Sequence, residues 1–516
     1  MEEPLVVASA PGKVLLTGAY LILEQPSAGL VLSTSARFFA ITKPVHPGVD
    51  DASWAWSWTD VVVVSPQLSK EIVYKLSLRN FTLQKVSNSS KDSNLFVEKA
   101  VELAVATAQI MCKDKQMENN LKKSLLKGLQ ITILGSNDFY SFRNHIEAKG
   151  LPLASSTLYS LTDFSPITLN SASDSTADIQ VPEVAKTGLG SSAAMTSAVV
   201  ASILCYLGAV KLPCKNMLVG RETREKDLEI VHSISQAAHS LAQGKIGSGF
   251  DVSTAVFGSQ RYVRFSPQVL SCVQDSSKYM PFSDVARSLL DEHWDTERQQ
   301  FALPPSLQLI VGEPGFGGSH TPSMVGAIQR WRKSFPQKAN ALWSELGQSN
   351  MDVERSLSAL KMIAKDKVNE YKSVLQVCDN LTAEQWKYGC EGEIHLQVVE
   401  ALLATRHAFL KVRSLLRQVG EAADVPVEPP PQTTLLDATM NMKGVLFAGV
   451  PGAGGFDAAF AITLSLSSRQ LVEELWSSQG VLALCVVEDP QGVRLEDRDP
   501  RQKPVTEQLD ALTLQN

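Results

Sequence analysis

The chain has 516 residues, of which 44% are hydrophobic and 20% are charged, and its formal net charge is −6. A chain of this length is too long for one ordinary core, so two or three domains are expected. The negative charge argues against non-specific binding to nucleic acid or to an anionic membrane, because both require a basic surface.

The cysteines and the two ends of the chain bear on its compartment. The seven cysteines are widely spread and form no CxxC pair, which favours a reducing compartment over a disulfide framework. The first residues, MEEPLVVASAPGK, carry acids where a secretory signal needs a basic start and an apolar core. The last residues, LTLQN, do not match an SKL-type peroxisomal signal. We therefore expect a cytoplasmic protein, with the peroxisome as the alternative.

The first third of the chain predicts mainly strands. An apolar run at 5–8 ends at the sequence SAPGK, so we expect a turn that carries Lys13 between two strands. Helical periodicity appears at 96–110. Other strand-like pieces lie at 29–35, 37–42, 61–64 and 130–134.

The most informative stretch is KTGLGSSAAMTSA, residues 186–198. Gly188 and Gly190 permit backbone angles that other residues avoid, and they leave space for a ligand. Residues 193–207 predict an apolar helix whose unpaired N–H groups and dipole would face this loop. The stretch therefore predicts a polyphosphate site, in which Ser191 and Ser192 either cap backbone donors or bind Mg²⁺.

Three other interpretations of this stretch are weaker. A dinucleotide-binding GxGxxA motif needs a preceding apolar strand and a later acid on a second strand, and neither context is convincing here. The Walker A pattern GxxxxGK[ST] is absent. Residues 193–210 carry no charge and just reach the length of a membrane span. Their small and polar composition favours a buried core helix instead.

A second informative stretch is GKIGSGFDVSTAVFG, residues 244–258. It places Asp251 after a flexible turn at the start of a helix or strand, where an aspartate is also an ordinary N-cap. Residues 228–243 before it predict a helix with His232, Gln236 and His239 on a similar face. Two histidines seven residues apart are not a metal site by themselves, so we expect packing or surface roles for them.

The second half of the chain predicts a mixture of helices and short strands. Helices dominate 323–418, and the sequence EAADVPVEPPPQ at 421–432 is too proline-rich for a helix. Two further glycine-rich stretches stand out, GEPGFGGSHTPSMV at 312–325 and PGAGG at 451–455. Strands are expected at 261–265, 307–311, 444–450 and 481–487, with a mixed connection at 266–300 and a small-residue segment at 456–462.

Three motifs in this order, PGK, GLGSSAA and GVPGAGGFDA, resemble those of the GHMP small-molecule kinases. More narrowly, EVAKTGLGSSAAMTS, GKIGSGFDVSTAVFGS and GEPGFGGSHTPSMV resemble the plant-type phosphomevalonate kinases. The resemblance implies an α+β fold, with an N-terminal domain like the second domain of ribosomal protein S5 and a ferredoxin-like C-terminal domain with added helices. We expect these domains at 1–265 and 301–516, joined by 266–300. The implied reaction is transfer of the γ-phosphoryl group of ATP to 5-phosphomevalonate.

The resemblance also implies roles for individual residues. Lys13 and Asp251 would be catalytic, and 452–455 would support the site from the C-terminal domain. One of Ser191 and Ser192 would lie near Mg²⁺. Since a phosphate acceptor has a second pKa of about 6 and is mostly anionic, we expect Asp251 to orient Lys13 and the acceptor more than to remove a proton. ATP would be bound by Lys186, Thr187, Gly188, Leu189, Gly190, Ser191, Ser192 and Ala193.

The acceptor site is less well specified by the sequence. We expect it at Ser248, Gly249, Ser319, His320 and Thr321. The last three lie in the GFGGSHT sequence, whose glycines can aim N–H groups inward. Two other functions remain open: another GHMP kinase such as mevalonate kinase, and a ligand sensor that keeps the fold without catalysis. No nucleic-acid or membrane partner is expected. Cationic candidates for the acceptor phosphate are Arg37, Arg143, Arg264 and His320.

Overall fold

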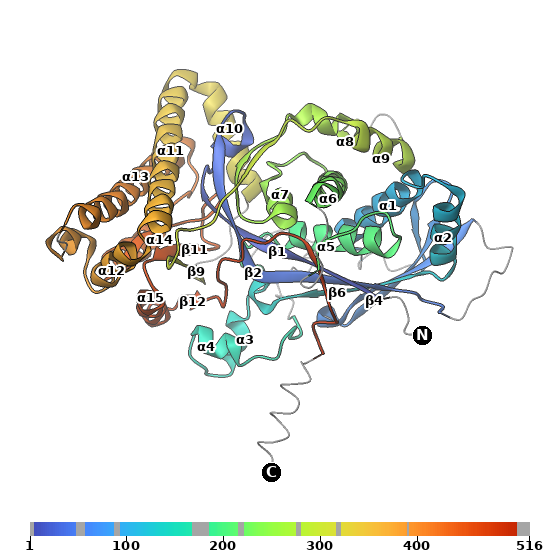
Figure 1. Ribbon diagram of the computed structural model, residues 1–516, viewed down its shortest axis with the longest axis horizontal. Coiled ribbons are helices and arrows are strands. Elements are labelled where there is room, and N and C mark those ends of the chain that lie inside the picture. Colours follow the sequence, from blue (N-terminus) through green and yellow to red (C-terminus); the bar gives the residue numbers. More distant parts are fainter. Residues whose placement is uncertain are drawn as a thin grey trace, which may run out of the picture.

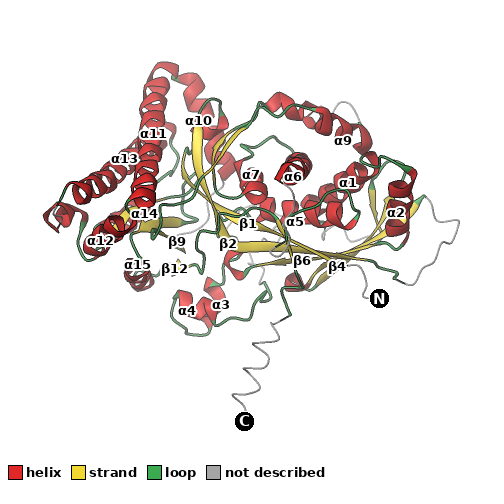
Figure 2. Cartoon of the chain, in the orientation of Figure 1, coloured by secondary structure: helices red, strands yellow, loops and turns green. Residues whose placement is uncertain are grey.

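The structure is a computed structural model that describes residues 5–47, 57–86, 93–167, 185–214, 221–274, 280–315, 321–389 and 392–502. Within these residues the chain forms two sheets, each covered by helices (Figures 1 and 2). No helix in the described ranges has the length and apolar character needed to cross a bilayer.

The larger sheet belongs to the N-terminal half of the chain. Nine described strands form it in the order β13-β1-β2-β6-β3-β4-β5, with β7 joined to β2 and β8 joined to β7. All pairs are antiparallel except β3 with β6. The strands are β1 (Val6–Thr17), β2 (Ala28–Lys43), β3 (Trp58–Ser65), β4 (Lys70–Ser77), β5 (Leu83–Lys85), β6 (Leu129–Gly135), β7 (Gln260–Val263), β8 (Glu297–Gln300) and β13 (Arg494–Glu496).

Helices cover one face of this sheet, and the small helices α3 and α4 lie on its other side (Figure 1). Helix α5 is buried on nearly all sides between β1, β2, α1 and α6, which explains why its sequence is apolar throughout and lacks an amphipathic pattern. The helices are α1 (Leu95–Ile110), α2 (Lys115–Leu126), α3 (Arg143–Ala148), α4 (Ser155–Tyr159), α5 (Ser191–Tyr206), α6 (Arg221–Gln243), α7 (Phe250–Phe257), α8 (Ser271–Gln274) and α9 (Phe282–Asp291).

The smaller sheet has the strand order β10-β11-β9-β12 among the described residues. With the helices between its strands, it repeats the β-α-β-β-α-β arrangement of ferredoxin-like folds. Helices α11 and α13 pack side by side at the outer end of this half (Figure 1). The elements are β9 (Gln308–Glu313), α10 (Thr321–Ser334), α11 (Pro336–Asp366), α12 (Val368–Asp379), α13 (Glu393–Ala423), α14 (Pro430–Met440), β10 (Val445–Gly449), β11 (Ala459–Thr463), α15 (Leu466–Ser478) and β12 (Leu482–Ala483).

Three local predictions were wrong. The PGK sequence is not a turn, because β1 continues through it with an irregularity in register between Pro11 and Lys13. The prolines at 429–431 do not exclude a helix, because α14 begins with Pro430 at its first position, where proline is tolerated. The last expected strand, 481–487, is regular only at Leu482–Ala483, and β13 follows it.

The division of the chain at 1–265, 266–300 and 301–516 stays a prediction. The segment 266–300 lies with the larger sheet, because β8 pairs with β7 and α9 packs against α1. The end of the described chain also returns to this sheet, because β13 pairs with β1. The predicted helices at 96–110 and 193–207 and the predicted strand at 130–134 are confirmed.

Candidate active site

The glycine loop before α5 has the backbone shape that a phosphate loop requires. Gly188 and Gly190 have φ of +76° and +77°, in the left-handed region that favours glycine. Gly190 is the N-cap of α5 and supplies no capping side chain. The N–H groups of the first turn therefore have no side-chain cap from this position, and the positive end of the helix dipole faces the loop.

Lys13 reaches this loop from the middle of β1. Its backbone N–H donates to the Leu189 carbonyl at 2.8 Å, and its Nζ donates to the Gly188 carbonyl at 3.0 Å. A Cβ at Gly190 would come within 2.9 Å of Lys13 Cε, so the lysine chain lies directly across the glycine. Burial lowers the pKa of the Lys13 amine, and the Asp251 carboxylate opposes this shift. A cation is thus held beside the first turn of α5.

Asp251 lies in the first turn of α7, after the left-handed Gly249. Its Oδ1 accepts a hydrogen bond from the Val252 N–H at 2.9 Å. Its Oδ2 is 4.0 Å from His239 Nε2. Among the described residues no ion pair within 4.0 Å joins Asp251 to Lys13, so the carboxylate influences Lys13 through space and keeps an oxygen available.

His239 was missed by sequence reasoning, which gave it a packing or surface role. It is only 5% exposed, and its Nε2 lies 3.1 Å from Ser192 Oγ as well as near Asp251. Burial lowers the pKa of His239, and Asp251 opposes that shift. The one signal in the sequence is its place near the end of α6, just before the glycine turn that leads to Asp251. His232 on the same helix is buried against aromatic rings, as expected for packing.

Lys13, Asp251 and the glycine loop line a cleft of about 360 Å³ between the two sheets, and His239 lies behind its lining. One wall comes from the N-terminal half and includes Lys13, Gly190 and Asp251. The opposite wall is the glycine turn 451–454 and α10. Tyr20 joins the two walls, because its hydroxyl donates to the Ala453 carbonyl at 2.5 Å. The other lining residues are Leu15, Ile22, Leu23, Lys186, Gly188, Ser191, Ser192, Ser248, Phe250, Val325, Asp457 and Ala458.

The C-terminal glycine turn, which forms part of the cleft wall, is fixed by backbone hydrogen bonds. The Gly455 N–H donates to the Val427 carbonyl at 2.9 Å, and the Gly454 N–H donates to the Pro451 carbonyl at 3.1 Å. A Cβ at Gly454 would lie 2.1 Å from the Val427 carbonyl oxygen, so only glycine fits there. The third motif thus presents backbone to the cleft from the C-terminal half.

The comparisons with known proteins agree on one family. No protein-family model matches the chain. The chain is 54% identical over 513 residues to a protein of Arabidopsis thaliana named phosphomevalonate kinase, peroxisomal, covering 99% of this chain and 100% of the relative. The chain belongs to the phosphomevalonate kinase family. A Gibberella zeae relative named phosphomevalonate kinase ERG8 is 30% identical over 516 residues, covering 97% of this chain and 98% of the relative.

Solved structures support the GHMP kinase fold of this family. The Lin0012 protein of Listeria innocua matches with a TM-score of 0.60 at 13% identity, over 96% of this chain and 100% of that one. A Streptococcus pneumoniae phosphomevalonate kinase, solved with phosphomevalonate and AMPPNP, matches with a TM-score of 0.54 at 14% identity, over 94% and 100%. The predicted α+β fold class and the GHMP kinase resemblance are thus confirmed.

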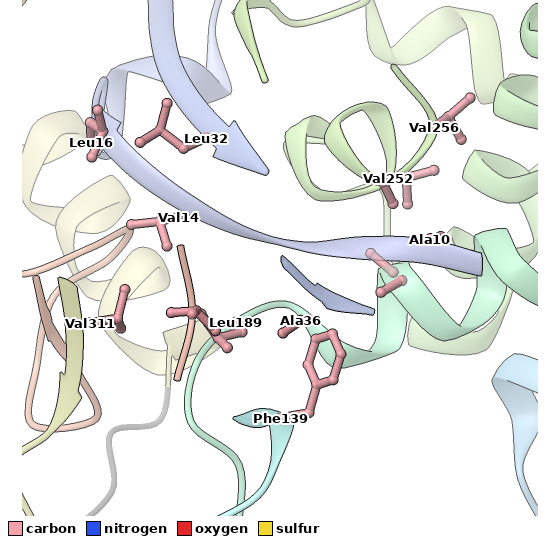
Figure 3. Packing of buried hydrophobic residues seen from close by; sticks show 14 of the residues in the cluster. Ala10, Val14, Leu16, Leu32, Ala36, Phe139, Leu189, Val252, Val256 and Val311 are labelled. Carbon is pink, nitrogen blue, oxygen red and sulfur yellow. The ribbon is translucent and has the colours of Figure 1, made fainter. Parts of the chain in front are cut away.

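Within this kinase fold, the predicted nucleotide residues fall into two groups. Lys186, Gly188, Gly190, Ser191 and Ser192 line the cleft. The side chains of Thr187, Leu189 and Ala193 are buried, so these three residues can offer only backbone groups to a ligand. Leu189 belongs to the cluster of buried residues that also holds Val14, Phe139 and Val311 (Figure 3). The loop is therefore anchored to the core by alternate residues.

The predicted acceptor residues are only partly described by the structure. Ser248 lines the cleft, and its carbonyl accepts a hydrogen bond from the Tyr262 hydroxyl at 3.0 Å. A Cβ at Gly249 would lie 2.5 Å from Phe265 Cε1, so this position needs glycine for space as well as for φ. Ser319 and His320 lie outside the described residues, as does the side chain of Thr321 at the start of α10.

The arginines suggested for the acceptor phosphate are occupied by the protein itself. Arg37 is buried and bonds to Ser9, Asp489 and the carbonyls of Gln491 and Gly492. Arg264 donates to the Leu23 and Gly247 carbonyls, each at 2.6 Å. Arg143 donates to the carbonyls of Glu313 and Gly480. None of the three lines the cleft, so their charges act in structure.

Proposed function

We propose that the chain transfers the γ-phosphoryl group of ATP to 5-phosphomevalonate, forming 5-diphosphomevalonate and ADP in the mevalonate route to isoprenoids. The observation that carries this proposal is the 54% identity to the Arabidopsis relative along nearly the whole of both chains. The two-walled cleft, with its glycine loops and its lysine and aspartate, has the parts that phosphoryl transfer needs.

The nucleotide phosphates would bind at the first turn of α5. The left-handed glycines of the loop and the N–H groups of α5 supply donors without side chains, and the Lys13 amine adds a positive charge beside them. In phosphoryl transfer most of the catalytic effect comes from alignment and from stabilising charge on the phosphoryl oxygens. Lys13 would act on both substrates, because it can also reduce the repulsion between ATP and a phosphorylated acceptor.

Mg²⁺ fits the chemistry of this loop. The ion prefers oxygen ligands and usually takes few protein groups together with substrate phosphates. Ser191 and Ser192 offer hydroxyl oxygens at the cleft, and the described residues contain no group of three His, Cys, Asp or Glu side chains that could hold a metal. We propose that one serine contacts Mg²⁺ and that the ATP phosphates supply most other ligands. The bound ion would neutralise phosphate charge.

Asp251 would orient Lys13 and the acceptor. The acceptor oxygen is a phosphate monoester with a second pKa of about 6, so most molecules reach the site already deprotonated at neutral pH. A strong general base is then less necessary than in kinases that act on a hydroxyl. His239, which lies between Ser192 and Asp251, would hold these two side chains in their relative positions.

The acceptor's own phosphate would bind near 248–249 and near the GFGGSHT sequence at 315–321. The double variant Ser319→Ala, Thr321→Ala should raise the KM for 5-phosphomevalonate more than the KM for ATP. Steady-state kinetics with each substrate varied in turn provides the measurement. A larger effect on ATP would assign this loop to the nucleotide.

A single assay separates the proposed function from its alternatives. Coupled detection of ADP release is run with 5-phosphomevalonate and, separately, with mevalonate. Turnover of 5-phosphomevalonate alone supports the proposal, and turnover of mevalonate alone identifies a mevalonate kinase. Nucleotide binding without ADP release on either acceptor would favour a ligand sensor.

The compartment can be tested independently of activity. The Arabidopsis relative is named peroxisomal, which supports the peroxisomal alternative for this chain. The widely spread cysteines of this chain favoured a reducing compartment, and the cytoplasm was the expected one. A fluorescent fusion of the full chain, imaged with a peroxisomal marker, distinguishes the two.

A further inference from the structure

A short segment, 138–143, lies between the phosphate loop and the C-terminal half of the chain. It leads from β6 into α3 on the side of the larger sheet opposite the main helix layer (Figure 1). Hydrogen bonds join it to the phosphate loop and to the C-terminal half, so its position constrains the positions of both. We call it the connecting segment below.

On one side the connecting segment is bonded to the residues that open the phosphate loop. The Ser141 N–H donates to the Ala185 carbonyl at 3.1 Å, and Tyr140 forms a β-bridge with Lys186. The Thr187 N–H donates to the Phe139 carbonyl at 3.3 Å, and the Thr187 hydroxyl donates to the Asp138 carbonyl. Three consecutive loop residues are therefore fixed just before Gly188.

On its other side the connecting segment is bonded to the C-terminal sheet. The Ser141 hydroxyl donates to Glu313 Oε1 at 2.5 Å, and Arg143 Nη2 donates to the Glu313 carbonyl at 2.8 Å. The same Nη2 donates to the Gly480 carbonyl at 2.5 Å. The Cys485 N–H donates to Asp138 Oδ1 at 2.6 Å. These partners lie at the end of β9 and on both sides of β12.

Arg143 is the central group of this connection. Its side chain is 14% exposed, as is that of Glu313. A Cβ at Gly315 would lie 2.4 Å from Arg143 Cζ, so the guanidinium packs directly against the backbone that follows β9. A guanidinium can donate to several carbonyls in a fixed plane. Arg143 therefore fixes the end of β9 relative to the connecting segment, to which the phosphate loop is hydrogen-bonded.

We propose that Arg143 and Glu313 are positioning residues that couple the phosphate loop to the C-terminal sheet, so that ATP and the acceptor bind interdependently. This inference rests on the proposed function. A ligand that orders the phosphate loop would restrict the connecting segment, and the segment would in turn restrict the end of β9. Such coupling is a free energy shared by the two ligands, so each must change the affinity of the other by the same factor.

Calorimetry on the full chain can measure the coupling. The Kd of AMPPNP is determined alone and with saturating 5-phosphomevalonate, and the reciprocal titration checks that both give the same factor. We expect at least about a fivefold factor for the unmodified chain, in the usual range for coupled sites. Arg143→Met should bring this factor close to one while changing the two separate Kd values much less. Ser141→Ala, which leaves Arg143 in place, should lower it partially.

Arg406→Met is the matched control. Arg406 also bonds to several carbonyls, those of Met440, Val445 and Leu446, but all lie inside the C-terminal half. Both Arg406→Met and Arg143→Met should lower the melting temperature, because each removes several hydrogen bonds. Arg406→Met should leave the coupling factor unchanged. An unmodified chain without coupling, or an unchanged factor in both Arg143→Met and Ser141→Ala, would overturn the inference even if 5-phosphomevalonate is turned over. Absence of that turnover would instead overturn the proposed function, and this inference with it.

Discussion

Two clusters of charge on either side of the C-terminal glycine turn differ in how far their charges are neutralised. In the cleft, the amine of Lys13 bonds to one carbonyl, and no ion pair within 4.0 Å joins it to Asp251 in the described part of the chain. Behind the turn, Arg413 and Glu428 are 3% and 1% exposed and form a two-bond pair at 2.7 and 3.0 Å. Arg417 adds a third bond to the same carboxylate at 2.7 Å.

The difference separates a charge that is left available to a ligand from charges that hold the fold. A buried charge is unfavourable unless it is paired. Arg413 and Glu428 are paired with each other and with Asp437 and Arg417, and they hold the chain next to Val427, whose carbonyl fixes Gly455. Lys13 keeps an incompletely satisfied charge, and the lowered pKa of its amine records the unfavourable burial. A phosphate can supply the missing partner. The following variants test this contrast.

Replacing Lys13 should have the largest effect on activity. We expect Lys13→Met to lower kcat about 10³-fold, equivalent to about 4 kcal/mol of transition-state stabilisation. The melting temperature should stay the same or rise, because methionine removes a charge whose burial is unfavourable. Kinetics and thermal unfolding of the same preparation provide the measurements. Lys186→Met, on the exposed part of the same loop, is the control and should cost far less; equal losses would contradict a special role for Lys13.

The opposite outcome is expected behind the turn. Glu428→Gln removes the carboxylate that Arg413 and Arg417 share and leaves Arg413 only its pair with Asp437. It should lower the free energy of unfolding by about 3 kcal/mol, with kcat little changed at a temperature where the variant is folded. Urea unfolding at pH 7 gives the first quantity. Glu118→Gln breaks an exposed pair with Lys122 and should cost below about 1 kcal/mol. A Glu428 variant that unfolds normally but is inactive would move this cluster into the catalytic machinery.

Asp251→Asn should reduce kcat about 10²-fold. If Asp251 orients Lys13 and the acceptor, the loss should be similar at every pH from below to above the acceptor's second pKa of about 6. A pH profile of kcat for the variant and the unmodified chain provides the measurement. Activity that recovers once the pH exceeds the acceptor's pKa would show that proton removal is the main role.

The smallest expected effect is on the stability of a Glu488 variant. Glu488 lies between the two kinds of charge, because its carboxyl is buried but accepts hydrogen bonds instead of forming a close ion pair with a described residue. Burial raises the pKa of this carboxyl to about 6, against hydrogen bonds from Leu303 and Ser259. The folded state therefore binds the proton more tightly than the unfolded state, and stability falls as the pH rises from 4.5 through 6. Glu488→Gln should be more stable above pH 6, by at most about 2 kcal/mol, and should lose this advantage near pH 4.5. The free energy of unfolding of both proteins is measured in urea across this pH range. If the two values change in parallel with pH, this titration of Glu488 is excluded.

The sequence predicted the parts of the site that consist of glycine turns and the residues next to them. The loop around Gly188 and Gly190 could be predicted because these positions require backbone angles that only glycine adopts easily, and α5 because an apolar run of this length must be buried. His239 could not be predicted in this way. A buried histidine on a helix looks the same in the sequence whether it packs against rings, as His232 does, or bonds to Ser192.

Two of the wrong predictions share a physical cause. Proline was taken to end regular structure at the PGK and PPPQ sequences, but both places tolerate it. Pro11 lies next to a register irregularity in β1, and Pro430 begins a helix where no N–H is needed. Contacts between distant parts of the chain, such as Arg143 with Gly480 and Arg37 with Gly492, depend on how the halves meet. Local patterns carry no information on them.

The pairing of β13 with β1 has a consequence for how the protein is made. The strand that carries Lys13 is made long before one of its neighbours, Arg494–Glu496. Until β13 has been translated, one edge of β1 has no strand beside it and can pair with another chain. A product that stops before β13 would retain every residue that lines the cleft and would still be prone to aggregation, because it exposes an edge of the strand that carries Lys13.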